Sequence, residues 1–574
     1  MNSDLTTNNT LRSLNEPTTI DINGDEYLIN GIPDNFVVND GGLYQIVDES
    51  YIYISAQIFC LGYVKNAEHK TWERKIAFKD FEGQWQSIVL PMNETSSSAN
   101  KLAQHLSYHG LHFVEGQKKK LYDYVLACNP SQRFISVNKP GWYGDTYVSP
   151  KGGLFGRYIY NAPSNMQQFY QQSGELEQWK NNVAALCAGN SRLMFSVSVV
   201  FCSLILPLID GQCCVFHLYN KSSTGKSSAL KLAMSVLGKG LMTWHTTDNA
   251  LEEFLQRLNH SAGIFDEIAQ LPKNKLSEVI YMVCNGEGRA RFGQTDKRNT
   301  WLNNCLSSGE FSIKSALTDS KQGLYEGQEV RFVDICADAG EGHGVLDDIH
   351  NYPDSGAAIE ALNCAVDNYY GTAGQYFTDE VMSDKELCTS LALDFRNEFL
   401  EKINVSELDS IERRVASNFA NVVAAGKLAT DLGITGWPLD EVVWAGEECF
   451  RSWQDSRENS EAEVLESAVT TIQAKLMRAS RNKFISQDNP TPKGHYWGKR
   501  EGNNYFIFTD VFNNTLCAGM DFQKVRRVLV NHGYITSASD RRDTVLKRID
   551  GTVTRCVHVN ETLFNTSLSF DDVA

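Results

Sequence analysis

Apolar and polar residues alternate along the first part of the chain in the manner of short strands. Such runs fill most of the segment from Leu43 to Leu90, and Glu82-Gly83 suits a hairpin turn between two of them. A helical pattern follows from Lys101 to Gly110, and an extended pattern returns before residue 165. Residues 1–20 are mostly polar. We therefore predict a flexible N-terminus over residues 1–20 and an α+β N-terminal domain over residues 21–165.

From about residue 175 the pattern changes to short apolar runs separated by helix-length segments. Three such runs occupy residues 215–220, 261–267 and 301–310. Short apolar strands that alternate with helices are typical of a parallel sheet with crossover helices. We predict an α/β core over residues 175–355, and the helical periodicity of the next segment predicts a helical unit over residues 356–455.

The pattern of the last hundred or so residues predicts a fourth unit. Residues 521–535 form an amphipathic helical pattern, and residues 543–559 hold two β-rich runs that turn at Asp550-Gly551. A helix followed by such a hairpin is typical of a winged helix, which we place at residues 461–562. Residues 563–574 are assigned to a tail.

The overall charge argues against a protein that coats nucleic acid or an anionic membrane. Lys and Arg number 53 and Asp and Glu 70, which gives a net charge of −17. Both kinds of surface attract positive charge, so bulk attraction is excluded. Residues 461–560 differ, because they contain 15 basic and 10 acidic residues. A locally positive C-terminal unit is therefore compatible with DNA contact.

The cysteines and the one long apolar run indicate an ordinary cytoplasmic protein. The 14 cysteines include no C-x-x-C pair, so we interpret them as small core residues in a reducing compartment. The N-terminus lacks the hydrophobic region of a secretion signal. Residues 193–209 are uncharged, but about 17 residues with three serines and Pro207 barely span a bilayer. We predict a buried helix there and no membrane contact.

A phosphate-binding loop follows the first core strand. The strand VFHLY precedes Asn220-Lys-Ser-Ser-Thr-Gly-Lys-Ser-Ser228, and a helical pattern continues from there. In this context backbone N–H groups surround a phosphate, Lys226 reaches the β and γ oxygens, and the Ser227 hydroxyl ligates Mg²⁺. Asn220 stands where the motif has glycine, and Asn tolerates left-handed backbone angles. The predicted ATP-binding residues are Asn220, Ser223, Thr224, Gly225, Lys226, Ser227 and Ser228.

Two carboxylates end the second core strand. Asp266 and Glu267 close the apolar run GIFDE, where a doubly wound sheet presents its ligands. We expect Asp266 to hold the Mg²⁺ water shell and Glu267 to polarise the attacking water, which favours hydrolysis over binding alone. The third strand ends in Ser307 and Ser308, and a hydroxyl there has the right chemistry to position that water; Ser308 is our choice. The alternative for the acidic pair is a solvated strand end.

Basic residues gather in a predicted hairpin before the third strand. Residues 286–301 alternate and carry three glycines, so they predict a β-hairpin. In hexameric helicases a hairpin at this place projects toward the central channel, where cations hold one strand's phosphates. The alternative is a solvated turn. The predicted DNA contacts here are Arg289, Arg291, Lys297 and Arg298.

Further arginines suggest contacts with nucleotide and DNA. Arg331 precedes another apolar strand, from which it can act on a neighbouring subunit's γ-phosphate as an arginine finger. Arg413 or Arg414 can approach the same nucleotide from the helical unit, of which we choose Arg414; a helix-surface salt bridge is the alternative. In the winged helix, the predicted DNA contacts are Arg526, Arg527, Arg541 and Arg548, and a protein-contact winged helix is the alternative.

Taken together, these motifs resemble those of a known protein family. The segments FHLYNKSSTGKSSALKLAMSVLG, WHTTDNALEEFLQRLNHSAGIFDEIAQ, EVIYMVCNGEGRARFGQ, SSGEFSIK and GQEVRFVDICADAG, with the later AAGKLATDLGITGW, resemble the family catalogued as domain of unknown function nine-two-seven. The resemblance covers about residues 45–440. It implies an AAA+ core with a helical lid, like that of the replicative helicases of staphylococcal cassette chromosomes and the MCM helicases. It also implies a homo-hexameric ring and the roles given above for Lys226, Ser227, Asp266, Glu267, Ser308, Arg331, Lys297 and Arg298.

Three hypotheses for function follow. The first is an ATP-dependent DNA helicase or translocase that replicates a phage or mobile element and acts on single-stranded or forked DNA. The second is an ATP-regulated origin-binding initiator that uses the winged helix without processive unwinding. The third is a primase-helicase, but residues 1–165 show no zinc ribbon and no obvious acidic triad. Priming therefore requires a separate primase or initiator as partner.

Overall fold

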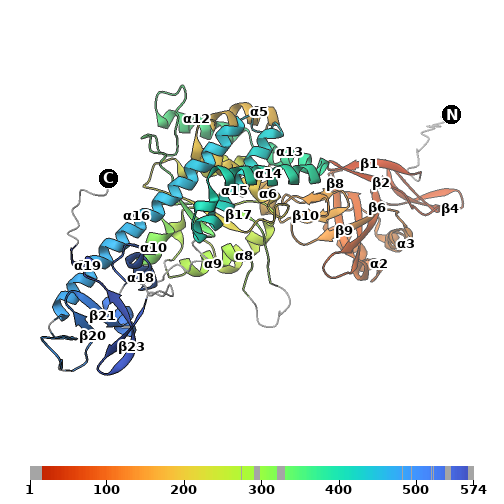
Figure 1. Ribbon diagram of the computed structural model, residues 1–574. Coiled ribbons are helices and arrows are strands. Elements are labelled where there is room, and N and C mark those ends of the chain that lie inside the picture. Colours follow the sequence, from red (N-terminus) through yellow and green to blue (C-terminus); the bar gives the residue numbers. More distant parts are fainter. Residues whose placement is uncertain are drawn as a thin grey trace, which may run out of the picture.

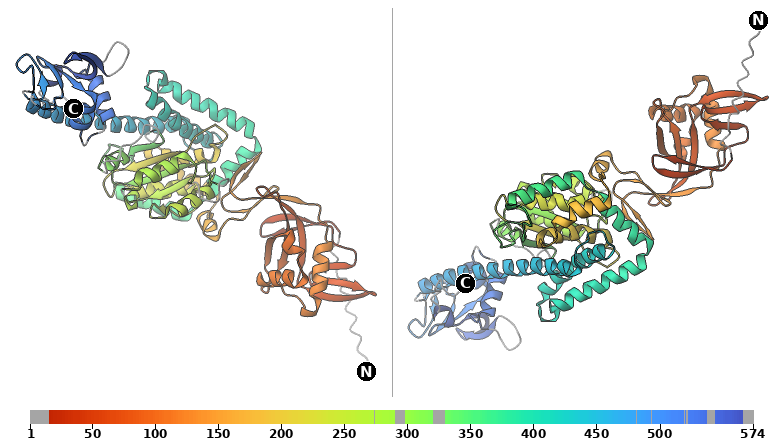
Figure 2. Two further views of the ribbon diagram at one scale, coloured as in Figure 1. Left: turned by 90° about the horizontal axis from the view of Figure 1, so that it is seen from below. Right: turned by 90° about the horizontal axis from the view of Figure 1, so that it is seen from above.

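The molecule consists of three bodies in a row. In the computed structural model the described residues are 16–272, 274–289, 298–319, 330–480, 482–492, 494–518, 520, 522–536 and 544–565. An N-terminal unit lies at one end, an α/β unit with its helices in the middle, and a smaller C-terminal unit at the other end (Figure 1). Two further views show the same order (Figure 2).

The N-terminal unit combines strands and helices, in keeping with the α+β pattern of its sequence. Its main sheet has six strands in the order β12-β13-β9-β6-β7-β8. Helices α2 (Ala99–Tyr108) and α3 (Lys118–Ala127) contribute Leu106 and Leu121 to the core that the sheet shares. The strands of this sheet are β6 (Ile58–Asn66), β7 (Trp72–Lys79), β8 (Trp85–Pro91), β9 (Arg133–Val137), β12 (Gly153–Phe155) and β13 (Tyr158–Tyr160). Smaller sheets pair β1 (Thr18–Ile22) with β2 (Asp25–Ile29) and join β3 (Phe36–Asn39), β4 (Gly42–Val47) and β5 (Ser50–Ser55).

The central unit is built on a five-stranded parallel sheet in the order β15-β16-β17-β14-β18. The predicted strands are present as β14 (Cys214–Tyr219), β16 (Gly263–Asp266) and β17 (Asn304–Gly309). They are joined by β15 (Met242–Thr243) and β18 (Phe332–Cys336). Strand β17 is late in the sequence, yet it pairs with both β14 and β16. The strands that carry the phosphate-loop motif and the acidic pair are therefore separated by one inserted strand.

Helices cover this sheet and fill its faces. Every residue of α6 (Ser191–Ile205) is buried, and the helix packs against α7 (Lys226–Ser235) and the later helical unit. The uncharged run is thus a buried helix, as its sequence predicts. Within the part of the chain that the structure describes, no helix combines the length and apolar character needed to cross a membrane. The other crossover helices are α8 (Asp248–Arg257), α9 (Leu276–Asn285) and α10 (Ile313–Asp319).

A helical unit follows the sheet, and its last helix extends past the end predicted for the unit at residue 455. It contains α12 (Ser355–Asn368), α13 (Thr372–Ser383), α14 (Lys385–Lys402) and α15 (Ser410–Asp431). Helix α16 then runs without interruption from Leu439 to Ala479 and crosses the predicted break between residues 455 and 461. Residues 447–479 contain neither Gly nor Pro, so nothing local ends the helix. The C-terminal unit therefore begins within α16.

The C-terminal unit packs the end of α16 against a sheet and a second helix. Leu476 of α16 shares a core with Leu529 of α18 (Phe522–Asn531). The predicted hairpin is present as β22 (Val545–Ile549) and β23 (Thr552–Val559), and both turn residues have left-handed angles, with φ 47° at Asp550 and 78° at Gly551. The sheet also contains β19 (Phe484–Ile485), β20 (Gly498–Glu501) and β21 (Asn504–Phe508).

One hairpin of the predicted N-terminal domain packs on the central unit instead. Strands β10 (Gly141–Tyr143) and β11 (Thr146–Val148) form a separate two-stranded sheet. The Trp142 indole donates to the Leu204 carbonyl of α6 at 2.8 Å, and the Trp142 backbone N–H lies 3.0 Å from Nδ1 of His260. At the turn, Lys385 of α14 donates to the Gly144 carbonyl at 2.9 Å. The hairpin thus contacts both the central sheet unit and the helical unit.

Candidate active site

An open cleft lies at the carboxyl ends of β14, β16 and β17. Its cavity volume is about 410 Å³. The predicted loop residues from Ser223 to Ser228 line it together with Asp266, Glu267 and Ser308. Parallel strands end at the same edge of a sheet, and ligands of α/β proteins bind there. The structure therefore brings together in one cleft residues that lie more than eighty positions apart in the sequence.

The loop before α7 takes the left-handed conformation at two places. Gly225 has φ 90° and Ser223 has φ 67°, and the loop then leads directly into the helix N-terminus. A Cβ at Gly225 would lie 2.7 Å from a methyl of Val345, so only glycine fits there without a shift. The Val345 backbone N–H donates to the Thr224 carbonyl at 2.9 Å. The loop is therefore held from behind by a segment that follows β18.

Asn220 has a different role from the one expected. Its φ is not positive, so the left-handed tolerance of Asn is not used at this position. Its side-chain Nδ2 lies 3.7 Å from the Cys336 sulfur on β18, and its Oδ1 accepts from the Lys221 backbone N–H at 2.6 Å. Its backbone N–H donates to the Gly309 carbonyl at 3.2 Å. Asn220 thus ties the start of the loop to both neighbouring strands, which a glycine could do only through its backbone.

Lys226 lies within the loop and is held by it. Its Nζ donates to the carbonyls of Asn220 and Lys221, both at 2.7 Å, and lies 3.3 Å from the Thr224 hydroxyl. Burial lowers the pKa of this ammonium, whereas the nearby carboxylates of Glu310, Glu267 and Asp266 oppose that effect. Its short hydrogen bonds go to neutral carbonyl oxygens and not to these carboxylates, so the ammonium can still attract an anion at this place.

The acidic pair and Ser308 form one hydrogen-bonded group. The Ser308 hydroxyl donates to the Asp266 carboxylate, and it accepts from the Glu267 backbone N–H at 3.1 Å. Glu267 has φ 59° and ψ 73°, an uncommon conformation for a residue with a side chain. Such strain is retained where the surroundings fix it. Strand β17 thereby positions both carboxylates of the next strand.

Ser307 faces the other way from Ser308. Its hydroxyl accepts from the Trp244 indole at 3.0 Å and lies 3.0 Å from Nδ1 of His217. Both partners are fully buried, and burial lowers the pKa of His217 to about 4. Successive side chains of a strand point to opposite faces. Of the two serines that the sequence offered, Ser308 lies in the cleft and Ser307 lies in the core.

Several cleft residues were not identified from the sequence. They are Ser222, Glu310, His343, Ser355, Gly356 and Ile359. Glu310 had a usable signal, because it directly follows the strand that ends in Ser308. His343 and the first turn of α12 had none, because they reach the cleft only through the fold of the chain after β18.

The two predicted arginines of the nucleotide site lie outside the cleft. Arg331 precedes β18 at the amino end of the sheet, where its carbonyl accepts from the Val215 backbone N–H at 2.8 Å. The phosphate loop is at the opposite, carboxyl end of the same sheet. Arg414 is exposed on α15. The neighbouring Arg413 donates a hydrogen bond at 2.8 Å to the carbonyl of Leu408, which lies just before α15.

The basic hairpin is described only at its root. The Gly288 backbone N–H donates to the Asn299 carbonyl at 2.8 Å, which is hairpin pairing. Arg289 forms ion pairs with Asp248 and Glu278, each at 2.9 Å. Arg298 pairs with Glu287 at 3.1 Å. Arg291 and Lys297 lie outside the described residues. The two described arginines are therefore half-exposed and largely neutralised by neighbouring acids.

Two of the predicted arginines of the C-terminal unit are exposed on its surface. Arg527 on α18 and Arg548 on β22 are exposed, and Arg526 is half-buried. Arg541 lies outside the described residues. On β22 and β23 the exposed Leu546 and Arg548 pair with Arg555 and Val553, so this face of the hairpin mixes cations with apolar side chains.

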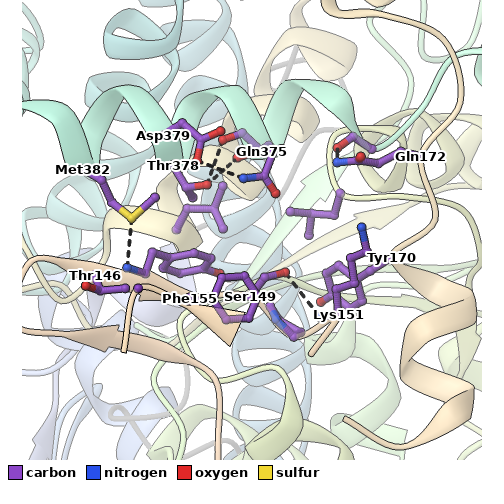
Figure 3. Close-up of a pocket in the computed structure, with 17 residues that line it drawn as sticks. Thr146, Ser149, Lys151, Phe155, Tyr170, Gln172, Gln375, Thr378, Asp379 and Met382 are labelled. Atoms are coloured by element: carbon purple, nitrogen blue, oxygen red, sulfur yellow. Dashed lines mark hydrogen bonds between the residues drawn. The ribbon is translucent and has the colours of Figure 1, made fainter. Parts of the chain in front are cut away.

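A second cavity has a different chemistry. It lies between α13 and the chain around β11 and β12, and its volume is about 220 Å³ (Figure 3). Its charged lining residues in the described part of the chain are Lys151 and Asp379, and the Gln375 amide donates to Asp379 at 2.9 Å. The phosphate loop and the acidic pair do not line it. The residues of the phosphate-loop motif and the acidic pair thus belong to the first cleft and not to this second cavity.

Comparison with known proteins gives a fold and a family. A solved structure described as an active helicase, Cch of SCCmec type IV, is similar over 93% of this chain and 98% of its own, with a TM-score of 0.67 and 16% identity. At that identity the likeness shows a shared fold. The C-terminal region of NrS-1 aligns over 64% of this chain and 87% of its own at 11% identity, but its TM-score of 0.24 supports no comparison.

Sequence comparison extends this result. No protein of curated function matches the chain. The family described as Domain of unknown function (DUF927) matches residues 38–300, which include the phosphate loop, the acidic pair and the basic hairpin. The resemblance inferred from the motifs is thereby confirmed over residues 38–300, slightly less than half of the chain, and the motifs that follow residue 300 lie outside the match.

Proposed function

We propose that this protein is an ATP-dependent DNA helicase or translocase of the AAA+ class that replicates a phage or mobile genetic element. One observation carries the proposal. Strand β17 is inserted between the strand of the phosphate loop and the strand of the acidic pair, and it brings Ser308 onto Asp266 and Glu267. That arrangement places Glu267, which can orient an attacking water, beside the phosphate loop. A protein that only binds nucleotide does not need such a group.

The residues of the cleft fit ATP and Mg²⁺. The loop offers backbone N–H groups at a helix N-terminus and a buried ammonium, which together suit a polyphosphate. The Ser227 hydroxyl and the Asp266 carboxylate are oxygen ligands of the kind that Mg²⁺ prefers. When bound, the ion would neutralise charge on the phosphates. Glu267 then orients and polarises the attacking water, and Ser308 holds Glu267 in place through its backbone.

The position of Arg331 supports a ring of subunits. Strand β18 has five residues, which at 3.3 Å per residue separates Arg331 from the cleft edge by about 16 Å. Within one chain Arg331 does not reach the phosphates. In a closed ring with head-to-tail contacts, one subunit presents its cleft to the opposite surface of the next. We propose a homo-hexamer in which Arg331 completes the neighbouring site, with α12–α15 as the lid that carries Arg414.

We also propose two DNA-binding elements. The hairpin of residues 286–301 contacts one strand in the ring, with Arg291, Lys297 and Arg298 as its cations. The C-terminal unit acts as a winged helix, with Arg526 and Arg527 on its helix and Arg541 and Arg548 near its wing. Exposed cations on a helix and an adjoining hairpin suit phosphate contacts on duplex DNA. A separate primase or initiator completes the replication reaction.

Unwinding of forked DNA tests the proposal directly. The wild-type protein should unwind a fork in the presence of ATP and Mg²⁺, and Lys226→Ala and Glu267→Gln should abolish both unwinding and hydrolysis. Lys231→Ala is the matched control, because Lys231 is exposed on the same helix α7. Hydrolysis that DNA never stimulates would contradict the proposal. Sequence-specific protection of duplex DNA without unwinding would instead favour the origin-binding initiator.

A further inference from the structure

Glu310 is a third carboxylate in the cleft, and the roles above leave it without a function. It directly follows β17, is exposed, and lines the cleft opposite the loop. The Ser222 hydroxyl, at the tip of the phosphate loop, donates a hydrogen bond to its carboxylate. Asp266 and Glu267 are joined to Ser308, whereas Glu310 is joined to the loop. The Glu310 carboxylate therefore interacts with the phosphate loop and not with the group formed by Asp266, Glu267 and Ser308.

The charge of Glu310 also acts on Lys226. Burial lowers the pKa of Lys226, and three nearby carboxylates raise it. Glu310 has the largest influence of the three. Ser222 and Lys226 are the donors that a terminal phosphate needs at this end of the loop. A carboxylate and a phosphate are both anionic acceptors, and like charges that share donors in a partly enclosed site repel each other. Glu310 and a terminal phosphate are therefore competitors for the Ser222 hydroxyl, and they repel each other beside Lys226.

Hydrogen bonds anchor the backbone on both sides of Glu310, so a change in its contacts would involve its side chain. The Gly309 carbonyl accepts from the Asn220 backbone N–H at 3.2 Å. On the other side, the Ile313 N–H at the start of α10 donates to the Asp334 carboxylate at 3.1 Å. Glu310 thus sits on a short segment anchored at both ends. Rotation of its side chain allows it to release Ser222 and to engage it again without a change in the strand.

We propose that Glu310 is a positioning residue that promotes release of the terminal phosphate after hydrolysis. It yields Ser222 while the triphosphate is bound, and it takes this hydroxyl back once the terminal phosphate has been cleaved. The proposal rests on the proposed ATP hydrolysis at this cleft. It assigns to Glu310 neither proton transfer nor metal binding, and it predicts that the residue lowers affinity for triphosphate more than affinity for diphosphate.

Glu310→Gln tests the proposal, because it removes the charge and keeps the size. The variant should bind ATP about fivefold to tenfold more tightly, while its affinity for ADP changes by less than about twofold. It should also release phosphate more slowly, measured as a phosphate burst followed by a slower steady rate, so that kcat and KM both fall. Glu310→Asp keeps the charge and should restore much of the wild-type ratio of the two affinities.

Two further variants make the test decisive. Ser222→Ala removes the hydroxyl that the terminal phosphate would use and keeps the carboxylate, so it should weaken ATP binding more than ADP binding, the opposite of Glu310→Gln. Glu360→Gln makes the same change on the exposed face of α12, outside the cleft, and should leave both affinities unchanged. Equal changes in ATP and ADP affinity for Glu310→Gln would overturn the proposal, as would no change in either. A wild-type protein that neither binds nor hydrolyses ATP would instead overturn the proposed function itself.

Discussion

The carboxyl edge of the central sheet and the root of the 286–301 hairpin are both rich in charge, but they use it differently. At the sheet edge, side chains from distant parts of the sequence converge on one cleft, and Lys226 is enclosed by carbonyl oxygens. At the hairpin root, Arg289 and Arg298 lie against Asp248, Glu278 and Glu287. A charge that the fold isolates is available to a ligand, whereas one that a neighbour neutralises contributes little. The predictions below test that distinction.

The largest effect is expected from Arg331, if the cleft is completed by a second subunit. Arg331→Ala should lower ATP hydrolysis by about 10³-fold, because it removes a cation from the developing charge of transfer. Lys226→Ala should be at least as inactive. Mixing the two inactive variants should restore part of the activity, since some interfaces then pair an intact loop with an intact arginine. A mixture that stays inactive at concentrations that form rings would contradict a shared site.

The adjacent serines of β17 provide a matched pair at the sheet edge. Ser308→Ala should lower kcat by about 10²-fold with little change in nucleotide affinity, because the Asp266 carboxylate loses a donor and the Glu267 backbone N–H loses one of its two acceptors. Ser307→Ala should leave kcat unchanged and lower the free energy of unfolding by about 1–3 kcal/mol, since the buried Trp244 indole loses its partner. Steady-state kinetics and urea unfolding separate the two outcomes. Equal effects on kcat would mean that the two hydroxyls do not have distinct roles.

Acid should destabilise the sheet beneath the cleft. Burial lowers the pKa of His217 from 6.5 to about 4, so between these values the unfolded chain binds a proton and the folded chain does not. Stability from this residue is therefore complete above about pH 6.5 and falls as the pH is lowered toward 4, by about 3 kcal/mol in total. His260, whose pKa is also lowered to about 4 by burial, acts in the same direction. Urea unfolding of the central unit, followed by tryptophan fluorescence between pH 7 and 4.5, measures the effect; a flat profile would contradict it.

The smallest effects concern single surface arginines in DNA binding. Arg548→Ala should weaken duplex binding about threefold and lower the salt slope by about one, because its side chain is exposed on β22. Arg289→Ala should change single-strand affinity by less than about twofold, since two carboxylates already neutralise this residue. Titration at several salt concentrations compares the two variants. A larger loss for Arg289→Ala than for Arg548→Ala would reverse the expected order of the two effects.

Much of the cleft could be predicted because its chemistry lies in continuous motifs. A strand, a loop and a helix in sequence placed Lys226 and Ser227, and an apolar run that ends in two acids placed Asp266 and Glu267. Glu310 directly follows β17 and could have been found, but only the serines at the end of that strand were considered. Val345 and His343 were missed because they reach the loop only through tertiary folding.

The remaining differences also have physical causes. The choice between Ser307 and Ser308 depends on which face of β17 meets the cleft, and the period of two cannot decide that for a strand buried on both faces. The boundary predicted between residues 455 and 461 falls inside α16, because residues 447–479 contain neither Gly nor Pro that would end the helix. The β10–β11 hairpin was assigned to the N-terminal domain by its place in the sequence, although Trp142 docks on α6.

The uninterrupted helix α16 has a mechanical consequence. Its 41 residues extend about 60 Å at 1.5 Å per residue, and it connects the central unit to the C-terminal unit (Figure 1). Contacts of Ser452 with β18 and of Arg457 with Asp409 anchor its first half on the central unit, so about 33 Å of helix extends beyond them. A helix anchored in this way can act as a lever arm: a tilt of about 10° at Arg457 would move its far end by about 6 Å, close to two base-pair steps along DNA.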